Sequence, residues 1–472
     1  MAFSFSRNFG EHLTPDRLVR EFILPWVIPE LYRYAWVDLF CGEGNLVIPL
    51  IESVPENRRA EFVASRVWMY DIQEKMVSRT IQKIVSLGVP EKIASSKIKV
   101  KDTLERYPEE LKQTGLPVFH VTNPPYLYLG YIRKNHESKG LYRYFITGNA
   151  GLQDLYQVSL NNDSSNGVER MIYIIPSNFL YASSGSNLIR KALLKRYSVK
   201  DAVILEKKVF SSTGFNVAIL HFQRKQDPKD ETQVFNVRKI GSGLMEREMV
   251  LRPSSSYRAG SYFDDFVSAH TGCNNLEVKF YLHSNDVYQN VGNHELMAID
   301  ANHYDSGKYA DMRIQVSTAL YTRIMANPIY VRTVDSGSIQ RRAGLGLIRK
   351  DFHADAIVAS KTYRTHPIQL FIDPPISADD SIFLARMFNL YLEHIREATD
   401  SEFMTTYKYS QSPYTRKYLG LNQVRSLIST IPLRTLSRQR RNEIMELIDA
   451  GKLEEAFILA RTNHEVQSQK DP

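Results

Sequence analysis

Short apolar runs alternate with amphipathic stretches along the first half of the chain. The runs have the length and composition of buried strands, and they are Ala35–Phe40, Val67–Tyr70, Lys97–Lys101, Val118–Val121, Met171–Ile175, Ala202–Leu205 and Val217–Phe222. Helix-like segments such as Glu74–Leu87 and Ser186–Arg196 lie between them. Because strands that are apolar on both faces are typical of parallel sheets covered by helices, the pattern predicts an α/β fold with helices on both faces of the sheet. The last two strands have a short connection, so we expect the final strand to be antiparallel.

The regular pattern stops at residues 224–232, a polar stretch that contains Pro228 and is typical of a domain boundary. Beyond it the pattern is irregular and rich in turn signals, which predicts a mixed α+β second domain. Helical periodicity returns at Ile382–Thr399 and Gln439–Ala460. We expect three parts, which are a first domain over 1–225, a second domain over 233–440 and a helical tail over 441–472.

Length and composition exclude several classes of protein. A chain of 472 residues is long enough for two or three domains, and its 43% hydrophobic content supports a packed core. The cysteines, Cys41 and Cys273, are too few for a disulfide framework or a four-ligand zinc site. The first residues do not have the pattern of a signal peptide, and no window approaches about 20 uninterrupted apolar residues. We therefore expect a cytoplasmic protein that does not span a membrane.

Basic residues are distributed unevenly, although the net charge of the whole chain is only +8. Residues 1–225 hold 30 basic and 22 acidic residues, whereas residues 226–472 hold 30 of each. The neutral second half contains two basic blocks, with net charges of +6 over 308–366 and +8 over 408–441. Such blocks favour an acidic partner such as nucleic acid, but most charge runs are merely solvated surface.

The strongest chemical signal is Asn123-Pro124-Pro125-Tyr126, directly after the apolar run 118–121. Two prolines force the chain out of the sheet and leave backbone carbonyls without partners there. Together with the Asn123 side-chain oxygen, these carbonyls form acceptors for a planar NH2 group, whose nitrogen becomes more nucleophilic when its hydrogens are held. Tyr126 adds an aromatic face on which a planar substrate can stack. The alternative is a proline turn that only ends the strand.

A turn with two glycines follows the first strand, in the sequence WVDLFCGEGN over residues 36–45. Gly42 and Gly44 let the backbone approach a ligand closely, and a helix is expected to begin near Leu46 with unpaired N–H groups. The third glycine of the dinucleotide-binding pattern is absent. A tight turn between strand and helix is therefore the alternative interpretation.

Acidic residues follow the next two strands. Asp71 comes directly after the second strand, where a carboxylate can accept hydrogen bonds from both hydroxyls of a ribose, and Ile72 can cover the face of an adenine. Asp102 follows the third strand, where it could accept a hydrogen bond from an adenine amino group. Each of these acids is also well suited to cap a helix, which is the alternative role.

In this order, the segments resemble a known family. Thr14-Pro15, the sequence DLFCGEG over 38–44, Asp71, Asp102 and the sequence NPPY over 123–126 have the order and approximate spacing of the S-adenosylmethionine-dependent amino-methyltransferases. The resemblance is to the gamma group of N6-adenine DNA methyltransferases, the Taq-type enzymes of restriction–modification systems. It implies a Rossmann-like methyltransferase sheet followed by a target-recognition domain. It also implies S-adenosylmethionine as the cofactor, without a metal.

The resemblance assigns roles to individual residues. The cofactor-binding residues that it implies are Thr14, Pro15, Asp38, Phe40, Gly42, Gly44, Asp71, Ile72, Asp102 and Asn123. The catalytic residues that it implies are Asn123, Pro124, Pro125, Tyr126 and Phe210, the last as a second stacking residue. Phe215 is a weaker candidate for that stacking role, and a core aromatic is the alternative for Phe210. Asp154-Leu155-Tyr156 matches a family segment near the cofactor adenine.

The implied activity is site-specific methylation of N6 of an adenine that is flipped out of duplex DNA. Such an enzyme would protect host DNA from a separate cognate restriction endonuclease, act as a monomer and lie with the nucleoid in a prokaryotic cytoplasm. In this context the basic blocks predict contacts with phosphates and base edges. The DNA-binding residues predicted from these blocks are Arg332, Arg341, Arg342, Arg349, Lys350, Arg364, Lys408, Arg416 and Lys417.

Three other functions are compatible with parts of the pattern. A protein-glutamine N5 methyltransferase also uses Asn-Pro-Pro-Tyr on an amide nitrogen, although such enzymes usually carry an extra domain before the catalytic one. An RNA adenine-N6 methyltransferase would need less sequence after residue 225. A binding module that has lost catalysis would not be expected to keep both Asn123 and Tyr126.

Overall fold

The structure is a computed structural model that describes residues 14–182, 185–206, 216–241, 244–335, 342–361, 366–399, 401–406, 417–433 and 435–461. The chain forms two compact units. The first unit combines residues 1–259 with 406–415, and the second combines 260–405 with 416–472.

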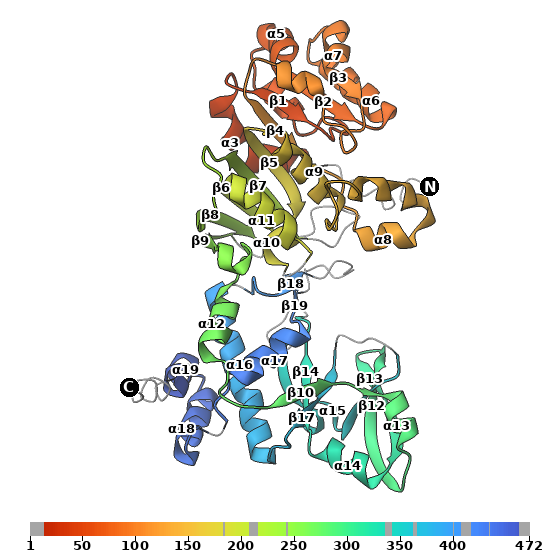
Figure 1. Ribbon diagram of the computed structural model, residues 1–472, viewed down its shortest axis with the longest axis vertical. Helices are drawn as coiled ribbons and strands as arrows, with labels where there is room; N and C mark the ends of the chain where they lie inside the picture. The colour runs from red at the N-terminus through yellow and green to blue at the C-terminus, as the bar shows by residue number, and fades with distance from the viewer. Residues whose placement is uncertain are drawn as a thin grey trace. The chain divides into compact units, whose positions relative to one another are not determined.

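Among the described residues, a nine-stranded mixed sheet forms the centre of the first unit (Figure 1). Its strands are β1 (Ala35–Asp38), β2 (Val67–Asp71), β3 (Ile98–Val100), β4 (Val118–Thr122), β5 (Arg170–Pro176), β6 (Tyr197–Leu205), β7 (Val217–Arg224), β8 (Gln233–Ile240) and β9 (Leu244–Leu251). Their order across the sheet is β3-β2-β1-β4-β5-β7-β6-β8-β9. The predicted strands correspond to β1–β7, and the predicted α/β fold is confirmed.

Strands β1 to β5 are parallel, and the order of the strands reverses direction between β1 and β4. From β1 the chain adds β2 and β3 on one side, and β4 then pairs with the other side of β1. In open α/β sheets, ligands bind beyond the carboxyl ends of the strands at such a reversal. Strand β7 is antiparallel to both of its neighbours, β5 and β6.

The sheet continues beyond the predicted final strand. β8 lies parallel to β6, with Ala202 opposite Val237, and β9 is antiparallel to β8. The polar stretch 224–232 is therefore a connection inside the first unit, and the two units meet in sequence between Ala259 and Gly260. Buried and exposed side chains alternate along β8, so it has no continuous apolar run and a search for such runs does not find it.

Helices connect the strands of the first unit, with α5–α7 grouped at the β1–β3 end and α9–α11 near β4–β7 (Figure 1). The α-helices are α2 (Asp16–Leu18), α3 (Leu24–Val27), α4 (Ile48–Glu52), α5 (Glu56–Arg66), α6 (Glu74–Ser86), α7 (Glu91–Lys97), α8 (Leu129–Lys134), α9 (Leu155–Ser165), α10 (Asn178–Tyr181) and α11 (Asn187–Arg196). A π-helical segment is η1 (Val19–Ile23), and the 3-10 segments are η2 (Ile28–Glu30), η3 (Glu109–Gln113), η4 (His136–Phe145) and η5 (Pro253–Ser255).

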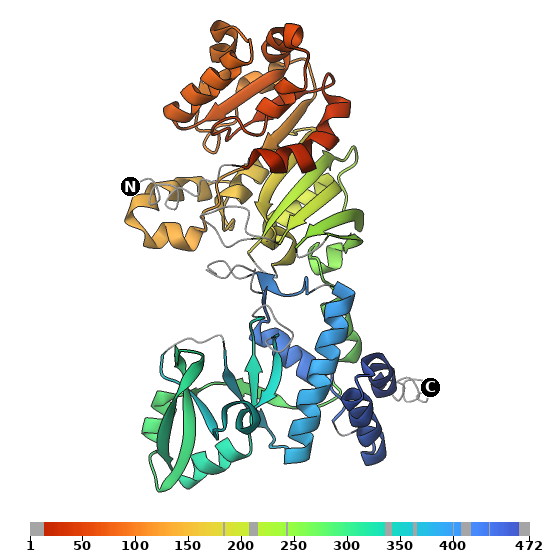
Figure 2. The same ribbon diagram turned by 180° about the vertical axis from the view of Figure 1, so that it is seen from behind.

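The first helical segment of the described chain, α2 to η2, packs across the later strands of the sheet. Figure 2 shows it in red beside these strands. The Trp26 ring stacks on His221 of β7, with 5.8 Å between the ring centroids, and the Arg238 guanidinium of β8 lies over the same tryptophan. The segment that begins with Thr14 is thereby fixed to the sheet that carries the strand ends.

The second unit contains two four-stranded sheets among its described residues, in the orders β10-β17-β14-β15 and β11-β16-β12-β13. The strands are β10 (Glu277–Phe280), β11 (Leu282–His283), β12 (His294–Asp305), β13 (Lys308–Val316), β14 (Ile329–Arg332), β15 (Gly344–Leu347), β16 (Ala356–Ala359) and β17 (Ile368–Asp373), and a short pair links β18 (Thr405–Thr406) with β19 (Lys417–Tyr418). The helices are α12 (Tyr262–His270), α13 (Ser284–Gln289), α14 (Thr318–Met325), α15 (Ile348–Phe352), α16 (Ala378–Thr399), α17 (Leu421–Ser429), α18 (Arg438–Asp449) and α19 (Leu453–Arg461).

Helix α16 carries the largest part of the second unit's core, and its buried residues include Phe383, Met387 and Tyr391. The helical tail that the sequence predicted as one stretch is divided into α18 and α19. Gly451 adopts a φ of +74° between them, a backbone conformation that ends a helix. No helix in the described ranges combines the length and the hydropathy needed to cross a bilayer.

Candidate active site at the carboxyl ends of the strands

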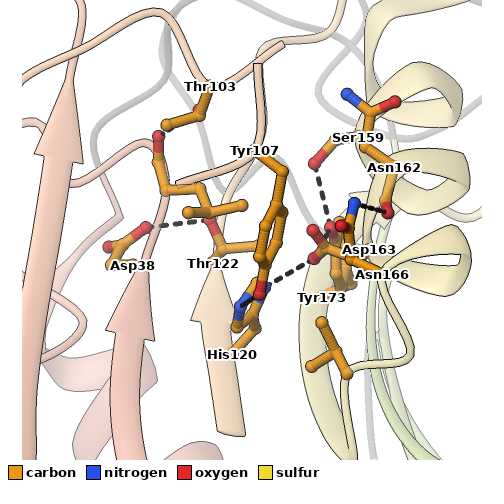
Figure 3. Close-up of polar contacts among 12 residues, drawn as sticks. Asp38, Thr103, Tyr107, His120, Thr122, Ser159, Asn162, Asp163, Asn166 and Tyr173 are labelled. Atoms are coloured by element: carbon orange, nitrogen blue, oxygen red, sulfur yellow. Dashed lines mark hydrogen bonds and ion pairs between the residues drawn. The ribbon is translucent and has the colours of Figure 1, made fainter. Parts of the chain in front are cut away.

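The carboxyl ends of β1 and β4 are joined by a buried carboxylate. Asp38 is the last residue of β1 and is fully buried. Its Oδ1 accepts hydrogen bonds from the Phe40 backbone N–H (3.0 Å) and from the hydroxyl of Thr122, the last residue of β4 (2.8 Å) (Figure 3). Its Oδ2 is buried and has no hydrogen-bond partner in the described part of the chain. Asp38 thus fixes the residue before Asn123 relative to the turn after β1.

Burial, together with the nearby Asp71 carboxylate, raises the pKa of Asp38 to about 7. The hydrogen bonds from Phe40 and Thr122 oppose this shift because they stabilise the charged form. Asp38 is therefore partly protonated near neutral pH. A cation brought near this end of the sheet would lower its pKa and favour the charged form.

The glycine-containing turn after β1 is held by the acid after β2. The Gly42 N–H donates to Asp71 Oδ2 at 2.8 Å, and the Thr80 hydroxyl of α6 donates to the Gly42 carbonyl. Gly44 has a φ of +80°, and a Cβ there would lie 2.7 Å from Ile48 Cδ1. Helix α4 begins at Ile48, two residues after the predicted start. The turn itself therefore requires glycine at position 44.

Asp71 and Ile72, which are adjacent at the end of β2, could both contact a ligand. Asp71 is 8% exposed, and its Oδ1 accepts the Gln73 N–H at 2.9 Å. Burial raises its pKa, while the backbone N–H donors of Gln73 and Gly42 lower it. Each carboxylate oxygen keeps a lone pair for a further donor. Ile72 is 57% exposed directly beside it, so its apolar surface is available for contact.

Asp102 lies after β3, as predicted, and both of its oxygens have protein donors. Oδ1 accepts the Glu105 N–H at 3.2 Å, within the turn that follows β3. Oδ2 accepts from the Tyr144 hydroxyl at 2.5 Å and from Arg143 Nη2 at 3.1 Å. Asp102 therefore anchors η4 to the loop after β3, an interaction that sequence analysis did not predict.

The predicted residues Thr14 and Asn123 are in direct contact, although 109 positions separate them. Thr14 is 4% exposed, and its Oγ1 accepts a hydrogen bond from Asn123 Nδ2 at 3.0 Å. Its carbonyl accepts from Asn45 Nδ2 at 2.9 Å, so the glycine-containing turn joins the same cluster. Pro15 is exposed and precedes α2.

The Tyr126 hydroxyl lies within hydrogen-bond reach of two acceptors, Asn123 Oδ1 and the Ile174 carbonyl at 2.6 Å. A phenol has one proton, so it donates to one acceptor at a time. Tyr126 is 5% exposed, packs edge-on against Tyr156 at 6.5 Å, and its burial raises its pKa.

The flanking residues of the motif are also described. Pro124 is buried, and Pro125 is half-buried. Asp154 precedes α9, and its Oδ1 accepts the Leu127 N–H at 2.9 Å. The segment that follows the motif is thus tied to α9, whose first turn carries Tyr156. Phe210 and Phe215 lie outside the described residues.

A buried polar network lies directly before this cluster on β4 (Figure 3). His120 Nδ1 and Asp163 Oδ2 are 2.6 Å apart, and neither side chain is exposed. The Tyr173 hydroxyl bonds to the same oxygen at 2.5 Å, and the Tyr107 hydroxyl is 3.2 Å from His120 Nε2. The Asp163 carboxylate accepts the hydrogen bond from the Nδ1–H of His120. The network connects β4, β5, α9 and the segment after β3.

The sequence holds one signal for these unpredicted residues. His120 and Thr122 are polar side chains in a strand whose other members are apolar, and both are fully buried. Buried polar groups are paired, so such residues indicate partners elsewhere in the fold. The identity of those partners is not encoded locally, because Asp163 is 43 positions away from His120.

The described basic residues of the second unit differ in their surroundings. Arg342 pairs with Glu393 at 2.8 Å, and Arg349 pairs with Asp355 at 2.8 Å. Arg332 is half-buried on β14 and donates to the Tyr330 hydroxyl. Lys350 is exposed, and Lys417 is half-buried. The other predicted DNA-binding residues, which are Arg341, Arg364, Lys408 and Arg416, lie outside the described residues. Within the described part of the chain, no cluster of His, Cys, Asp or Glu could hold a metal ion.

The fold and the polar strand ends define an α/β protein with a candidate ligand site at the reversal between β1 and β4. The model of the N-6 DNA Methylase family matches residues 2–313, which is about two thirds of the chain. The chain therefore belongs to the N-6 DNA methylase family. No curated protein sequence matches it.

Among solved structures, the chain matches several restriction–modification proteins. The type IIL restriction-modification enzyme MmeI, in complex with DNA, has a TM-score of 0.57 at 10% identity, over 96% of this chain and 71% of that one. A modification subunit of a putative type I restriction enzyme from Vibrio vulnificus YJ016 has a TM-score of 0.37 at 20% identity, over 50% of this chain and 48% of that one. The M protein of the type I restriction enzyme EcoKI gives 0.35 at 12% identity, over 48% of each chain. The chain thus spans about half the length of these two type I proteins.

Proposed function

We propose that this protein is an S-adenosylmethionine-dependent DNA methyltransferase of the gamma, Taq-type group, which methylates N6 of adenine in duplex DNA. The observation that carries this proposal is the meeting of Asp38, Asp71 and Asn123 at the carboxyl ends of β1, β2 and β4. Membership of the N-6 DNA methylase family supports it. So does the strand reversal beside which these residues lie, because ligands of open α/β sheets bind there.

The residues at the strand ends fit the proposed cofactor. Asp71 retains lone pairs for the two hydroxyls of a ribose, and the exposed Ile72 can cover one face of an adenine. The unpartnered buried oxygen of Asp38 fits a site that receives a cationic ligand. Thr14 and Gly42 would complete the binding surface. When bound, S-adenosylmethionine would supply an electrophilic methyl group.

Asn123 and the Pro124 carbonyl are the proposed acceptors for the two N6 hydrogens of the target adenine. The Asn123 Oδ1 has two lone pairs, so it can accept a hydrogen of the amine while the Tyr126 hydroxyl donates to it. The Ile174 carbonyl is the other acceptor within reach of that hydroxyl. Holding both hydrogens out of the amine plane favours the nucleophilic form of the nitrogen. Tyr126 and Phe210 are the proposed stacking residues, and an adenine must leave the duplex to reach them.

The remaining parts of the proposal concern partners. The second unit is the proposed target-recognition domain, with the basic residues of the 308–366 and 408–441 blocks on its DNA-binding surface. The proposed biological role is protection of host DNA from a separate restriction endonuclease. We propose a monomer that acts in a prokaryotic cytoplasm.

The proposal is tested by incubating the protein with S-adenosylmethionine and an unmodified plasmid, followed by sequencing that detects N6-methyladenine. We expect modification in one short sequence motif. The Asn123→Ala variant should strongly reduce it, whereas Asn161→Ala, which removes an amide on α9 that bonds to Asn149, should not. Modification of RNA or of a glutamine side chain instead would favour one of the other methyltransferase classes and contradict the proposal.

A further inference from the structure

The residues that follow the catalytic motif form a basic and aromatic surface that neither the sequence patterns nor the family assigned. This post-motif segment, residues 127–148, contains α8 and η4 and projects from the strand ends (Figure 1). It holds four basic residues, one acidic residue and four tyrosines. Because it begins directly after Tyr126, it lies at the same edge of the sheet as the candidate active site.

One face of the segment is built into the core. Leu129, Ile132, Tyr144 and Phe145 are buried in the main hydrophobic cluster of the first unit. The Leu129 N–H donates to the Gln153 carbonyl at 2.9 Å. Together with the bonds from Arg143 and Tyr144 to Asp102, these contacts fix the segment at both ends, so its outer face has a defined position.

The outer face presents cations beside aromatic rings. Arg133, Lys134 and Lys139 are exposed, and no carboxylate within the described ranges forms an ion pair with any of them. Tyr142 is 42% exposed, and the Arg133 guanidinium carbon lies 5.5 Å from its ring centroid. Arg133, Lys139, Tyr142 and Ile132 line an open hollow of about 330 Å³.

Tyr128 adds a second exposed ring nearer to the motif. It is 41% exposed and lies two residues after Tyr126. A Cβ at Gly130 would lie 2.5 Å from Tyr128 Cε1, so glycine at this position allows the ring to lie against the backbone of α8. An exposed ring held in this way is suited to contact a sugar or a base that passes over the segment.

We propose that the outer face of the post-motif segment binds the DNA backbone next to the extruded nucleotide, with Arg133, Lys134 and Lys139 on phosphates and Tyr142 and Tyr128 on sugars or bases. Uncompensated cations interleaved with exposed aromatic rings are the usual chemistry of nucleic-acid surfaces. The catalytic unit would then hold the target strand itself, in addition to any contacts from the second unit. This inference rests on the proposed function, because it takes DNA as the substrate.

The test compares two triple variants in the full-length protein. Arg133→Ala/Lys134→Ala/Lys139→Ala removes the cations of the segment, and Lys92→Ala/Lys191→Ala/Lys200→Ala removes three exposed lysines from α7, α11 and β6 of the same unit. Dissociation constants are measured by fluorescence anisotropy over a salt titration. The probe is a short labelled duplex that contains the site methylated by the wild-type protein. Cofactor affinity is measured in parallel by calorimetry.

We expect the segment variant to bind the duplex about tenfold more weakly and to lower the slope of log Kd against log salt by about 1 to 3, since each lost phosphate contact contributes about 0.9. The control triple variant should keep the wild-type slope, and both variants should keep the wild-type affinity for S-adenosylmethionine. A Tyr142→Ala variant should weaken binding severalfold while leaving the slope unchanged, because it removes stacking and no charge.

Failure of this inference is distinguishable from failure of the proposed function. If the wild-type protein methylates DNA but the segment variant keeps both Kd and slope, the surface does not bind DNA and only this inference is wrong. If the segment variant loses affinity for RNA or for another protein and not for duplex DNA, the inference is equally overturned. If the wild-type protein neither binds nor methylates DNA, both proposals fall.

Discussion

The strand ends of the first unit and the basic blocks of the second unit differ in the surroundings that the fold gives their polar residues. At the strand ends, Asp38, Asp71 and Asn123 come from distant positions and converge, because the carboxyl ends of neighbouring parallel strands lie on one edge. In the second unit, Arg342 and Arg349 pair with acids of their own unit. The order of the strands therefore explains why these residues lie together, whereas a count of charges does not reveal which cations have acidic partners.

The post-motif segment sharpens this difference. Its net charge is smaller than that of the 308–366 block, but Arg133, Lys134 and Lys139 are exposed and have no acidic partner in the described part of the chain. In the second unit, the 408–441 block contains two cations that already have partners. Arg441 bonds to Asp380, and Arg425 Nε donates to the Val278 carbonyl. The exposure and the acidic partners of individual cations, and not the net charge of a stretch of sequence, therefore indicate which cations are available to bind a ligand.

The largest expected effect is at the strand end itself. Replacing Asn123 by Ala removes one acceptor for the reacting amine, and we expect kcat to fall by about 10²–10³-fold with little change in the affinity for DNA. Single-turnover kinetics with labelled S-adenosylmethionine measures this. Asn161→Ala serves as the matched control. A fall of less than tenfold in kcat for Asn123→Ala would show that this side chain does not hold the reacting group.

The buried network of His120, Asp163 and Tyr173 is expected to stabilise the first unit. Asp163→Ala leaves His120 Nδ1 and the Tyr173 hydroxyl without their common acceptor, so we expect a loss of about 3 kcal/mol in the free energy of unfolding of the first unit. Asp163→Asn, which keeps the shape and one acceptor, should lose less. Urea unfolding followed by tryptophan fluorescence provides the comparison. Equal stability of the Ala variant and the wild type would contradict this assignment.

Asp38 predicts a pH dependence of stability with a definite sign. Its pKa in the folded state is about 7, above the ordinary value of 3.8, so the folded protein binds more protons than the unfolded chain between these values. Its contribution therefore destabilises the fold increasingly as pH rises from about 4 to 7. The difference in the free energy of unfolding between Asp38→Asn and wild type should therefore increase by about 2 kcal/mol, in favour of the variant, from pH 5 to pH 7.

The matched control for Asp38 is the exposed carboxylate Asp227, whose replacement by Asn should leave the pH profile of the wild type unchanged. The measurement is urea unfolding at pH 5, 6 and 7 for the three proteins. Parallel profiles for wild type and Asp38→Asn would mean that Asp38 is charged in the folded state at pH 5. The site would then already contain a group that compensates its charge.

The smallest effect is expected for the paired cations of the second unit. Arg342→Ala/Arg349→Ala should change the affinity for duplex DNA by less than about threefold, because both guanidinium groups already interact with Glu393 and Asp355. The segment variant, measured beside it in the same salt titration, should have the larger effect. The opposite ranking would assign the dominant backbone contact to the second unit.

Much of the first unit could be predicted from sequence. Apolar runs located β1–β7, and the positions of Asp71 and Asn123 after their strands followed from them. The first strand was predicted to continue to Phe40, whereas β1 ends at Asp38. Strands β8 and β9 could not be located in this way, because one face of β8 and the first half of β9 are largely exposed and neither has a continuous apolar run. The single predicted helix over 439–460 divides at Gly451, where a left-handed residue between two amphipathic stretches is not visible in periodicity alone.

Side-chain partners were the main unpredictable part of the site. The bond between Tyr144 and Asp102 spans 42 positions, and that between Thr14 and Asn123 spans 109. No local pattern encodes such pairs, which arise only when the sheet brings the loops together. The burial of the Tyr126 ring belongs to the same class. The motif predicted an aromatic side chain at this place but not the packing against Tyr156.

The central claim is that the strand ends transfer a methyl group to N6 of adenine in duplex DNA. Its most direct test is to incubate the wild-type protein with methyl-labelled S-adenosylmethionine and an equimolar mixture of unmodified plasmid and total RNA, and then to identify the labelled nucleoside by mass spectrometry. The account predicts label only in N6-methyl-2′-deoxyadenosine, and strongly reduced label with the Asn123→Ala variant at equal reaction time. Label in a ribonucleoside or in another deoxynucleoside, or undiminished label with Asn123→Ala, would contradict it.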